Sequence, residues 1–209
     1  MILPNSMVVP EKSQIPVSLK ASSTSTQQQE NSTDLAQMAR VMAHLELTGW
    51  YWGSITAWQA TQVLGDAPEG TFLLRKSSNL NYLFTLSVKT SLGPTHLRIE
   101  YCRGVFSFDS LVVARPRVQT FAGVVDLVQH YTLTCQRVSE NKDKDAKQMA
   151  SSPPKEAELQ LRLIRPLYII TPSLQHLCRM VINQKSRNIS HLPLPLKMKE
   201  YLQEYPFHV

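Results

Sequence analysis

One arginine inside an apolar segment constrains this chain more than any other feature. Arg75 lies in the run EGTFLLRKSS, residues 69–78, which otherwise has the aliphatic and aromatic residues of a buried strand. A buried guanidinium without a partner is costly, so this residue needs either an internal carboxylate or an external anion. Ser77 and Ser78 follow directly, and their hydroxyl and backbone N–H groups suit the remaining oxygens of a phosphate.

Polar side chains in the next two strand-like segments favour the external anion. Thr85 lies in the first of them, and His96 and Arg98 occupy alternate positions of the second. In an antiparallel sheet these side chains can converge on the face that carries Arg75. We therefore predict a phosphate-binding site formed by Arg75, Ser77, Ser78, Thr85, His96 and Arg98.

The segments around this site alternate as in an α+β domain. The run SITAWQATQVL predicts a helix that Thr56 caps, with Gln59 completing a capping box. Four strand-like runs follow, TFLLRKS, YLFTLSVKT, HLRIEY and VFSFDS. The later run FAGVVDLVQHYTL has a helical apolar face formed by Phe121, Val124, Val125, Val128 and Tyr131. This order predicts a central antiparallel sheet flanked by two helices.

The N-terminal part divides into a tail and a short helix. Residues 1–33 are predicted to be disordered, because Ser, Thr and Gln dominate the stretch before Asp34 and leave little to bury. Asp34 is the expected N-cap of a helix over residues 34–48. Its apolar stripe consists of Leu35, Met38, Val41, Met42 and Leu45. That stripe needs a covering surface.

A charged insert separates the second domain helix from the last strand. Residues 136–158 hold five Lys or Arg and five Asp or Glu, a mixture typical of a solvated loop. A simple linker is the favoured interpretation, and a degradation signal around Ser-Ser-Pro-Pro remains an alternative. The run LQLRLI then predicts a late strand with Leu159, Leu161 and Leu163 on one side.

The chain ends in a small helical segment, residues 168–209. Thr171, Pro172 and Ser173 fit an N-cap followed by proline at the first helical position. An apolar stripe with helical spacing follows, at Leu174, Leu177, Cys178, Val181 and Ile182. On pattern alone this stripe is either a core face or a docking surface. The segment LPLP, residues 192–195, then links to a last helix.

Composition excludes several classes of function. The net charge is +6, but residues 159–209 alone hold seven Lys or Arg against two Asp or Glu, and no arginine-rich run or stacking aromatics suggest nucleic-acid binding. No apolar run is long enough for membrane insertion, and the N-terminus is a poor signal peptide. Three widely spaced cysteines indicate free thiols in a reducing, cytoplasmic setting, with no metal site or cofactor. No nucleophile has an activating base, so we expect no enzyme.

Residues 49–167 resemble an SH2 domain, the reader of phosphotyrosine peptides. The resemblance rests on W-Y-W-G, on G-T-F-L-x-R-x-S, on the strands, and on the FxxVVxLVxHY helix. It implies that Arg75 forms the floor of the phosphotyrosine pocket. It also implies hydroxyl contacts from Ser77, Ser78 and Thr85, with His96 and Arg98 around the phosphotyrosyl ring and phosphate.

The C-terminal segment resembles a SOCS box. SLQHLCRMVI is similar to an elongin-C-binding box, with contact residues at Ser173, Leu174, Leu177, Cys178 and Ile182. LPLP is similar to a cullin-5-selecting box, which implies cullin contacts from Leu192, Pro193, Leu194 and Pro195. An SH2 domain followed by a small all-helical SOCS box is the layout of the suppressor of cytokine signalling (SOCS) family. Residues 34–48 then match its extended-SH2 helix, whereas no segment of the tail resembles a kinase-inhibitory region.

The resemblance implies a non-enzymatic adaptor that restrains cytokine receptor JAK-STAT signalling. Its expected partners are tyrosine-phosphorylated cytokine receptors or associated signalling proteins, elongin B/C, and cullin-5 with its RING partner. Captured proteins would be ubiquitinated, and masking of receptor phosphosites would be a second output. The sequence leaves two alternatives open: a scaffold that competes for phosphosites without recruiting a ligase, and a scaffold whose SH2 pocket does not function.

Overall fold

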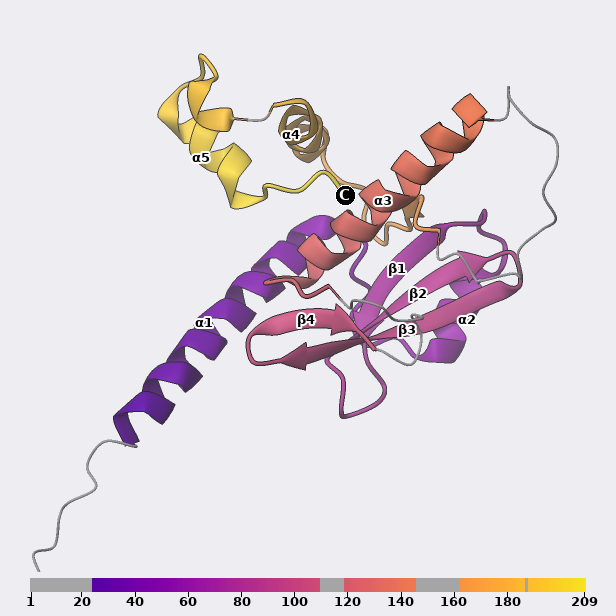
Figure 1. Ribbon diagram of the computed structural model, residues 1–209, viewed down its shortest axis with the longest axis horizontal. Helices are drawn as coiled ribbons and strands as arrows, with labels where there is room; N and C mark the ends of the chain where they lie inside the picture. The colour runs from indigo at the N-terminus through magenta and orange to yellow at the C-terminus, as the bar shows by residue number, and fades with distance from the viewer. Residues whose placement is uncertain (1–23, 110–118, 146–161, 187) are drawn as a thin grey trace, which may run out of the picture.

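The computed structural model describes residues 24–109, 119–145, 162–186 and 188–209 (Figure 1). Its centre is a five-stranded sheet in the order β4-β3-β2-β1-β5. The strands are β1 (Thr71–Lys76), β2 (Phe84–Thr90), β3 (Gly93–Cys102), β4 (Val105–Phe108) and β5 (Arg165–Pro166). Helices α1 (Thr24–Thr48) and α3 (Val124–Asp145) pack on one face, and α2 (Ala57–Gly65) packs on the other. The predicted α+β architecture is confirmed.

Side-chain alternation gives the sheet two different faces. The α1–α3 face carries the main apolar core, because Phe72 and Leu74 point there together with alternate residues of β2 and β3. On the α2 face, Leu73 packs against Ala60 and Leu64 of α2. Arg75 lies two residues after Leu73 and therefore projects on the α2 face.

Helix α2 begins where the sequence predicts. The Thr56 hydroxyl accepts a hydrogen bond from the Gln59 backbone N–H at 3.1 Å, and the Gln59 side-chain oxygen accepts one from the Thr56 N–H at 2.8 Å. This reciprocal capping box satisfies two N–H groups that have no partner inside the helix. The predicted cap is confirmed.

The last strand differs from its prediction. Residues 159–161 of the predicted strand lie outside the described part of the chain. Leu163 is fully buried, as the alternation indicates, but the strand pairing occurs at Arg165 and Pro166, which run parallel to Thr71 and Phe72. The alternation reports burial and does not fix which residues pair. The sheet is therefore antiparallel except for this β1–β5 pair.

Helix α1 is longer than predicted. It begins at Thr24, so the expectation of disorder is wrong for residues 24–33, and Asp34 is an interior residue, not the N-cap. Residues 1–23 of the predicted tail lie outside the described part of the chain. Val41 and Leu45 are buried against the sheet and α3, so the C-terminal half of the helix is held by packing. Extending a formed helix costs far less than nucleating one, which accounts for a polar first half that projects past the sheet (Figure 1).

Helix α3 also departs from its predicted limits. Phe121 precedes the helix and forms an isolated backbone bridge with Phe106. At its other end the helix continues to Asp145, so the expectation of a loop is wrong for residues 136–145. The packed first turns allow the helix to propagate into the charged residues that follow. Residues 146–158 of the predicted insert lie outside the described residues.

The C-terminal segment consists of α4 (Leu174–Lys185), a 3-10 turn η1 (Ile189–His191) and α5 (Leu196–Glu204). The N-cap of α4 is Ser173, whose hydroxyl accepts from the His176 N–H at 3.2 Å. The expectation of a cap at Thr171 and a helical Pro172 is therefore wrong. Ser173 has the extended conformation and the hydroxyl that an N-cap requires, and Pro172 precedes it.

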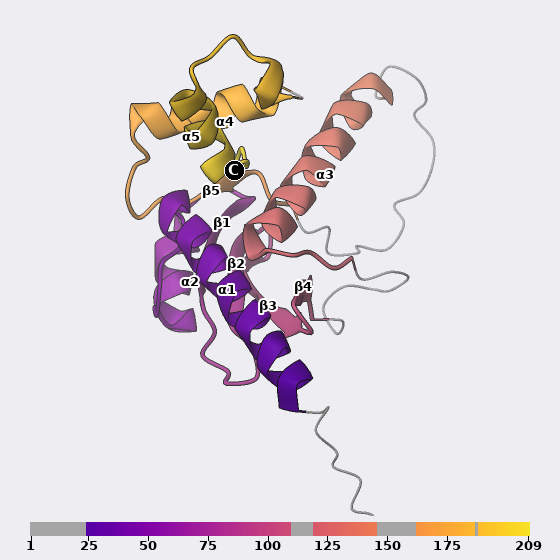
Figure 2. The same cartoon turned by 90° about the vertical axis from the view of Figure 1, so that its left-hand side faces the viewer.

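The chain end returns to the sheet domain and joins its core. Tyr205, Phe207 and Val209 are buried in the same cluster as residues of α1 and α3. The His208 N–H also donates to the Gln129 side-chain oxygen on α3 at 2.8 Å. The α4–α5 segment therefore sits beside α3 and the end of α1, anchored by the last residues of the chain (Figure 2).

Candidate functional site

The Arg75 side chain is buried without a carboxylate partner among the described residues. It is 3 % exposed, and neither of the ion pairs in the described residues includes it. Its Nε donates to the Ser87 hydroxyl at 3.2 Å, and its Nη1 donates to the Ser78 hydroxyl at 3.3 Å and the Lys76 carbonyl at 3.2 Å. Burial lowers the pKa of this guanidinium, because desolvation disfavours the charge. The described residues thus lend no support to the internal-carboxylate alternative.

The strand register brings other predicted residues to the same face. Arg75 lies opposite Thr85, and Thr85 lies opposite Arg98 on the next strand. Ser87 and His96 form the neighbouring pair. Thr85 and Ser87 are buried, whereas Arg98 is exposed at the outer side of this row. The face therefore offers a buried cation, hydroxyl groups and a second, exposed cation, which together can hold a phosphate group and an adjoining ring.

A chain of hydrogen bonds fixes the protonation of His96. Its Nδ1 lies 2.9 Å from the Ser87 hydroxyl, and its Nε2 lies 3.3 Å from the Thr61 hydroxyl. The Thr61 hydroxyl donates to the Ala57 carbonyl at 2.9 Å, so its oxygen is left to accept from His96. Ser87 accepts from Arg75 and can then donate to Nδ1 of a neutral imidazole. Burial and the charge of Arg75 both lower the pKa of His96, which favours the same neutral form.

Ser77, unlike Ser78, has no hydrogen bond to the Arg75 side chain. Its hydroxyl accepts from the Asn79 N–H at 3.1 Å, and its backbone N–H donates to the Leu83 carbonyl at 3.0 Å. These bonds close the turn between β1 and β2. The predicted phosphate contact of the Ser77 hydroxyl stays a prediction.

Three groups at this site were not predicted from the sequence. Ser87 and Thr61 orient Arg75 and His96, and Tyr82 lies below Arg98, whose guanidinium carbon is 5.3 Å from the ring centroid. The Tyr82 hydroxyl donates to the Asp109 carboxylate at 2.9 Å, which raises the pKa of that phenol. Ser87 could have been predicted, because it lies two residues after Thr85 on the same strand and therefore on the same face. Thr61 and Tyr82 come together with their partners only through the tertiary fold.

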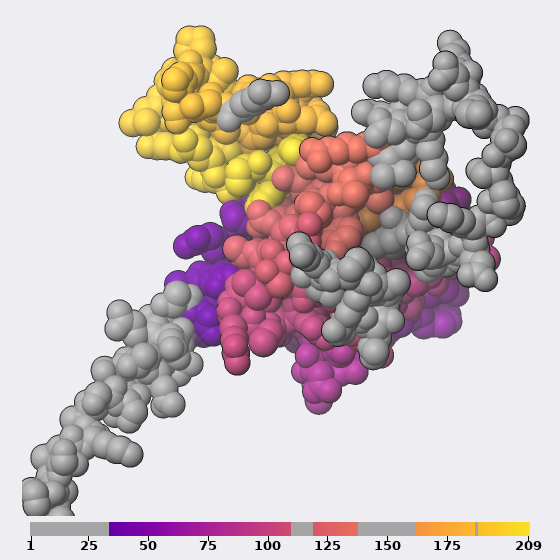
Figure 3. Space-filling model, in the orientation of Figure 1, coloured from indigo at the N-terminus to yellow at the C-terminus, as the bar shows by residue number. Residues whose placement is uncertain are grey.

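Helix α4 presents the predicted stripe to solvent. Leu174 is 77 % exposed, Val181 is 56 % exposed and Leu177 is 38 % exposed; Cys178 is also exposed, and Ile182 is half-buried. The helix instead buries His176, Arg179 and Met180 on its opposite side. The interpretation of the stripe as a core face is therefore wrong. It is a candidate docking surface on a lobe that projects from the body of the molecule (Figure 3).

The LPLP segment forms the connection between η1 and α5. The Leu192 N–H donates to the Ile189 carbonyl at 3.1 Å, and the Leu194 N–H donates to the Leu192 carbonyl at 2.8 Å. Pro193 and Pro195 are exposed, while Leu192 and Leu194 are half-buried. The described part of the chain contains no group of three metal-ligating side chains. None of its helices meets the length and hydropathy needed to cross a membrane.

Two protein-family models match this chain. A family model described as SH2 domain matches residues 50–131, and one described as SOCS box matches residues 171–203. The first match contains the Arg75 face, and the second contains the exposed stripe of α4. The chain is thus an SH2 domain followed by a SOCS box.

Individual relatives then define the family. Suppressor of cytokine signaling 2 of Sus scrofa is 45 % identical over 186 residues, which cover 89 % of this chain and 89 % of the relative. Cytokine-inducible SH2-containing protein of Gallus gallus is 44 % identical over 190 residues, which cover 88 % of this chain and 76 % of the relative. The chain belongs to the suppressor of cytokine signalling family. YLFTLSVKT, LVQHY, the charged insert and EYPFHV predict a greater likeness to the cytokine-inducible member. The identities of 45 % and 44 % favour neither relative over the other, and the chain is similar to both.

Proposed function

We propose that this protein is a phosphotyrosine adaptor that restrains cytokine receptor JAK-STAT signalling. Its SH2 domain captures tyrosine-phosphorylated receptors or their associated proteins. Its SOCS box recruits elongin B/C and cullin-5 with its RING partner, so that the captured protein is ubiquitinated in the cytoplasm. Occupation of a receptor phosphosite also masks that site from other SH2 proteins. Family membership supports the negative regulation of cytokine signalling.

The proposed capture of phosphotyrosine proteins rests on the buried charge of Arg75. Its hydrogen-bond partners are neutral oxygens, so no negative charge among the described residues pairs with the guanidinium. A phosphate supplies the opposite charge and a planar pair of acceptors for the guanidinium. Arg98 above Tyr82 can contact the phosphotyrosyl ring and a phosphate oxygen from the side. The hydroxyl groups of Ser78 and Thr85 complete the proposed pocket.

The proposed recruitment of elongin B/C and cullin-5 rests on the exposed face of α4. Leu174, Leu177 and Cys178 form an apolar stripe next to the capped start of the helix. We assign elongin C to Ser173, Leu174, Leu177, Cys178 and Ile182. We assign cullin-5 to Leu192, Pro193, Leu194 and Pro195, which lie after η1 on the same lobe. Burial of Leu174 and Leu177 in an elongin C pocket would remove apolar surface from water.

Two assays separate this adaptor from its alternatives. Binding of phosphorylated and unphosphorylated versions of one receptor peptide to the intact chain tests the pocket. Equal affinity for the two peptides would identify a scaffold with a pocket that does not function. Co-elution with recombinant elongin B/C tests the box, and its absence would leave a scaffold that competes for phosphosites without a ligase. Turnover by the purified chain would instead indicate an enzyme.

A substitution on α4 tests whether the two outputs are separable. Leu174→Asp places a charge in what should be a dry pocket, so we expect loss of elongin B/C at micromolar concentrations. Phosphopeptide affinity should stay within about threefold, because Leu174 lies on α4 whereas Arg75 lies on β1 of the sheet. Leu92→Asp is the matched control, since Leu92 is an exposed leucine on the β2–β3 turn. Retention of elongin B/C by Leu174→Asp would overturn the assignment of the box.

A further inference from the structure

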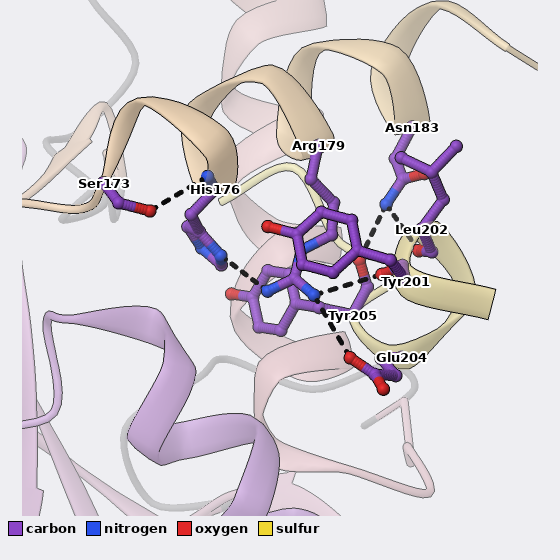
Figure 4. A network of polar contacts seen from close by, with 8 residues as sticks. All are labelled: Ser173, His176, Arg179, Asn183, Tyr201, Leu202, Glu204 and Tyr205. Atoms are coloured by element: carbon purple, nitrogen blue, oxygen red, sulfur yellow. Dashed lines mark hydrogen bonds and ion pairs between the residues drawn. The ribbon is translucent and has the colours of Figure 1, made fainter. Parts of the chain in front are cut away.

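The C-terminal end of α5 carries carbonyl groups that the helix cannot satisfy itself. In any α-helix the last four C=O groups have no intrahelical partner, and α5 has no basic residue in its last turn. Side chains from the buried face of α4 fill this role. Arg179 Nη1 donates to the Tyr201 carbonyl at 3.1 Å, and Asn183 Nδ2 donates to the carbonyls of Leu202 at 3.1 Å and Tyr205 at 2.7 Å (Figure 4).

Arg179 adds a charge to these hydrogen bonds. Its side chain is only 2 % exposed and lies at the negative end of the α5 dipole, where a cation is stabilising. The guanidinium carbon is 4.2 Å from the ring centroid of Tyr201 and 5.3 Å from that of Tyr205. The exposed Glu204 carboxylate lies 3.7 Å from Nη1. The buried cation is therefore compensated by carbonyl dipoles, two aromatic faces and one carboxylate.

The geometry around Arg179 requires a neutral His176. Arg179 Nη2 is always a donor, and it lies 2.7 Å from His176 Nδ1, which must then be an acceptor. A protonated imidazole would lose this bond and place a second cation beside the first. Both burial and Arg179 lower the pKa of His176 below its ordinary value. The titratable or charged groups around this cluster are Arg179, Tyr201, Glu204, Tyr205, Tyr168 and His44.

We propose that Arg179 and Asn183, two side chains of α4, cap the C-terminal end of the neighbouring helix α5. We also propose that Arg179 is a positioning residue for partner docking on the opposite face of α4. The name trans cap denotes these two side chains and the carbonyls of Tyr201, Leu202 and Tyr205. By fixing α5 and the chain end to the buried face of α4, the trans cap holds the Leu174–Leu177 stripe toward solvent. It operates only while His176 is neutral. The docking role rests on the proposed function, whereas the trans cap itself does not.

Amide hydrogen exchange of the full-length protein tests the trans cap without any partner. Arg179→Met keeps much of the apolar stem but removes the donors and the charge, so protection of the α5 amides should fall about tenfold or more. Arg179→Lys keeps the charge but cannot donate to both the Tyr201 carbonyl and His176 Nδ1 in one plane. Its α5 protection should therefore lie between those of Arg179→Met and the wild type. Lys185→Met is the matched control, because it removes an exposed cation from the last turn of the same helix. Protection of β2 and β3 should be unchanged in all three variants.

The pH profile distinguishes the trans cap from simple packing. Protection factors of α5, corrected for intrinsic exchange, should decrease in the wild type as the pH falls below about 6.5, because the folded lobe resists protonation of His176. His176→Gln retains a side-chain acceptor that does not titrate, so its α5 protection should lose most of this decrease. An unchanged pH profile in His176→Gln, or wild-type α5 protection in Arg179→Met, would overturn the trans cap.

Elongin B/C affinity then tests the positioning role. Arg179→Met should weaken elongin B/C binding about tenfold, although it leaves every residue of the exposed stripe in place, and Arg179→Lys should restore part of it. Lost α5 protection with unchanged elongin B/C affinity would contradict the positioning role. If the wild type itself does not bind elongin B/C, the proposed function fails, and the exchange data still decide on the trans cap.

Discussion

Folding and phosphate binding make opposite demands on Arg75. The fold buries the guanidinium at 3 % exposure against neutral oxygens, which costs free energy in the unbound protein. The proposed phosphate ligand would offset that cost with charge-assisted hydrogen bonds, each worth about 1.5–3 kcal/mol. The same burial keeps water away from the guanidinium, which strengthens its attraction to a phosphate. Burial therefore lowers the free energy of unfolding but favours the proposed ligand.

The first prediction follows from the planar geometry of this side chain. Arg75→Lys keeps a positive charge but loses the two parallel donors, so we expect phosphopeptide affinity to fall at least about tenfold while the fold is retained. Isothermal titration with one phosphopeptide measures the change. Arg162→Lys is the control, because Arg162 forms an exposed ion pair with Glu69 and should bind like the wild type. Near-wild-type affinity of a folded Arg75→Lys protein would remove Arg75 from the pocket floor.

Individual residues were predictable where one strand determines their direction. Strand alternation was enough to place Arg75, Thr85, His96 and Arg98 on one face. It was not enough for Ser77, because a turn rather than a strand decides where that hydroxyl points. Tyr82 meets Arg98 through a loop, and Arg179 meets Tyr201 through the packing of two helices. Neither contact leaves a local signal in the sequence.

At the scale of elements, α1 depends on packing rather than on helix propensity. Its sequence is rich in Ser, Thr and Gln, and the buried residues Val41 and Leu45 lie in its C-terminal half. We predict that Leu45→Ala lowers the free energy of unfolding by about 2–5 kcal/mol, because it opens a cavity in the core. Leu47→Ala should cost far less, since Leu47 is 42 % exposed. Urea denaturation compares the two, and equal losses would contradict the docking of α1.

The charged insert yields a prediction with limits set by α3. Because α3 continues to Asp145, the deletion should cover only residues 146–158. If this segment is a linker, phosphopeptide affinity and the melting temperature should stay close to those of the wild type. Fluorescence polarisation and thermal melts measure both. A large loss of either would show that the segment packs on the domain, whereas a longer cellular half-life would favour the degradation signal.

Element types were more predictable than element limits. The capping box of α2 and the alternation of the strands are local signals, and both were sufficient. The starts and ends of α1 and α3 depend on how far a packed helix propagates, which composition does not reveal. The pairing of β5 depends on where a connection returns to β1. Its two residues are too few to show any period.

At the scale of the whole molecule, the two domains share one core. Met180 of α4 and Tyr205, Phe207 and Val209 of the chain end lie in the same apolar cluster as Leu45. Hydrophobic periodicity could not predict this shared core, because the last five residues have no period. The shared core holds the lobe in place, yet the Arg75 face and the exposed α4 stripe use none of these buried residues. We therefore expect the two binding events to be independent although the domains are packed together.

A pull-down on beads tests whether one molecule of this protein binds a phosphopeptide and elongin B/C at the same time. A phosphopeptide immobilised on beads should retain elongin B/C only when this protein is added, and the unphosphorylated peptide should retain neither. Arg75→Lys should remove both proteins from the beads, whereas Leu174→Asp should leave the chain bound and remove only elongin B/C. Retention of elongin B/C by Leu174→Asp, or of the chain by the unphosphorylated peptide at equal level, would contradict the account of two separate sites on one adaptor.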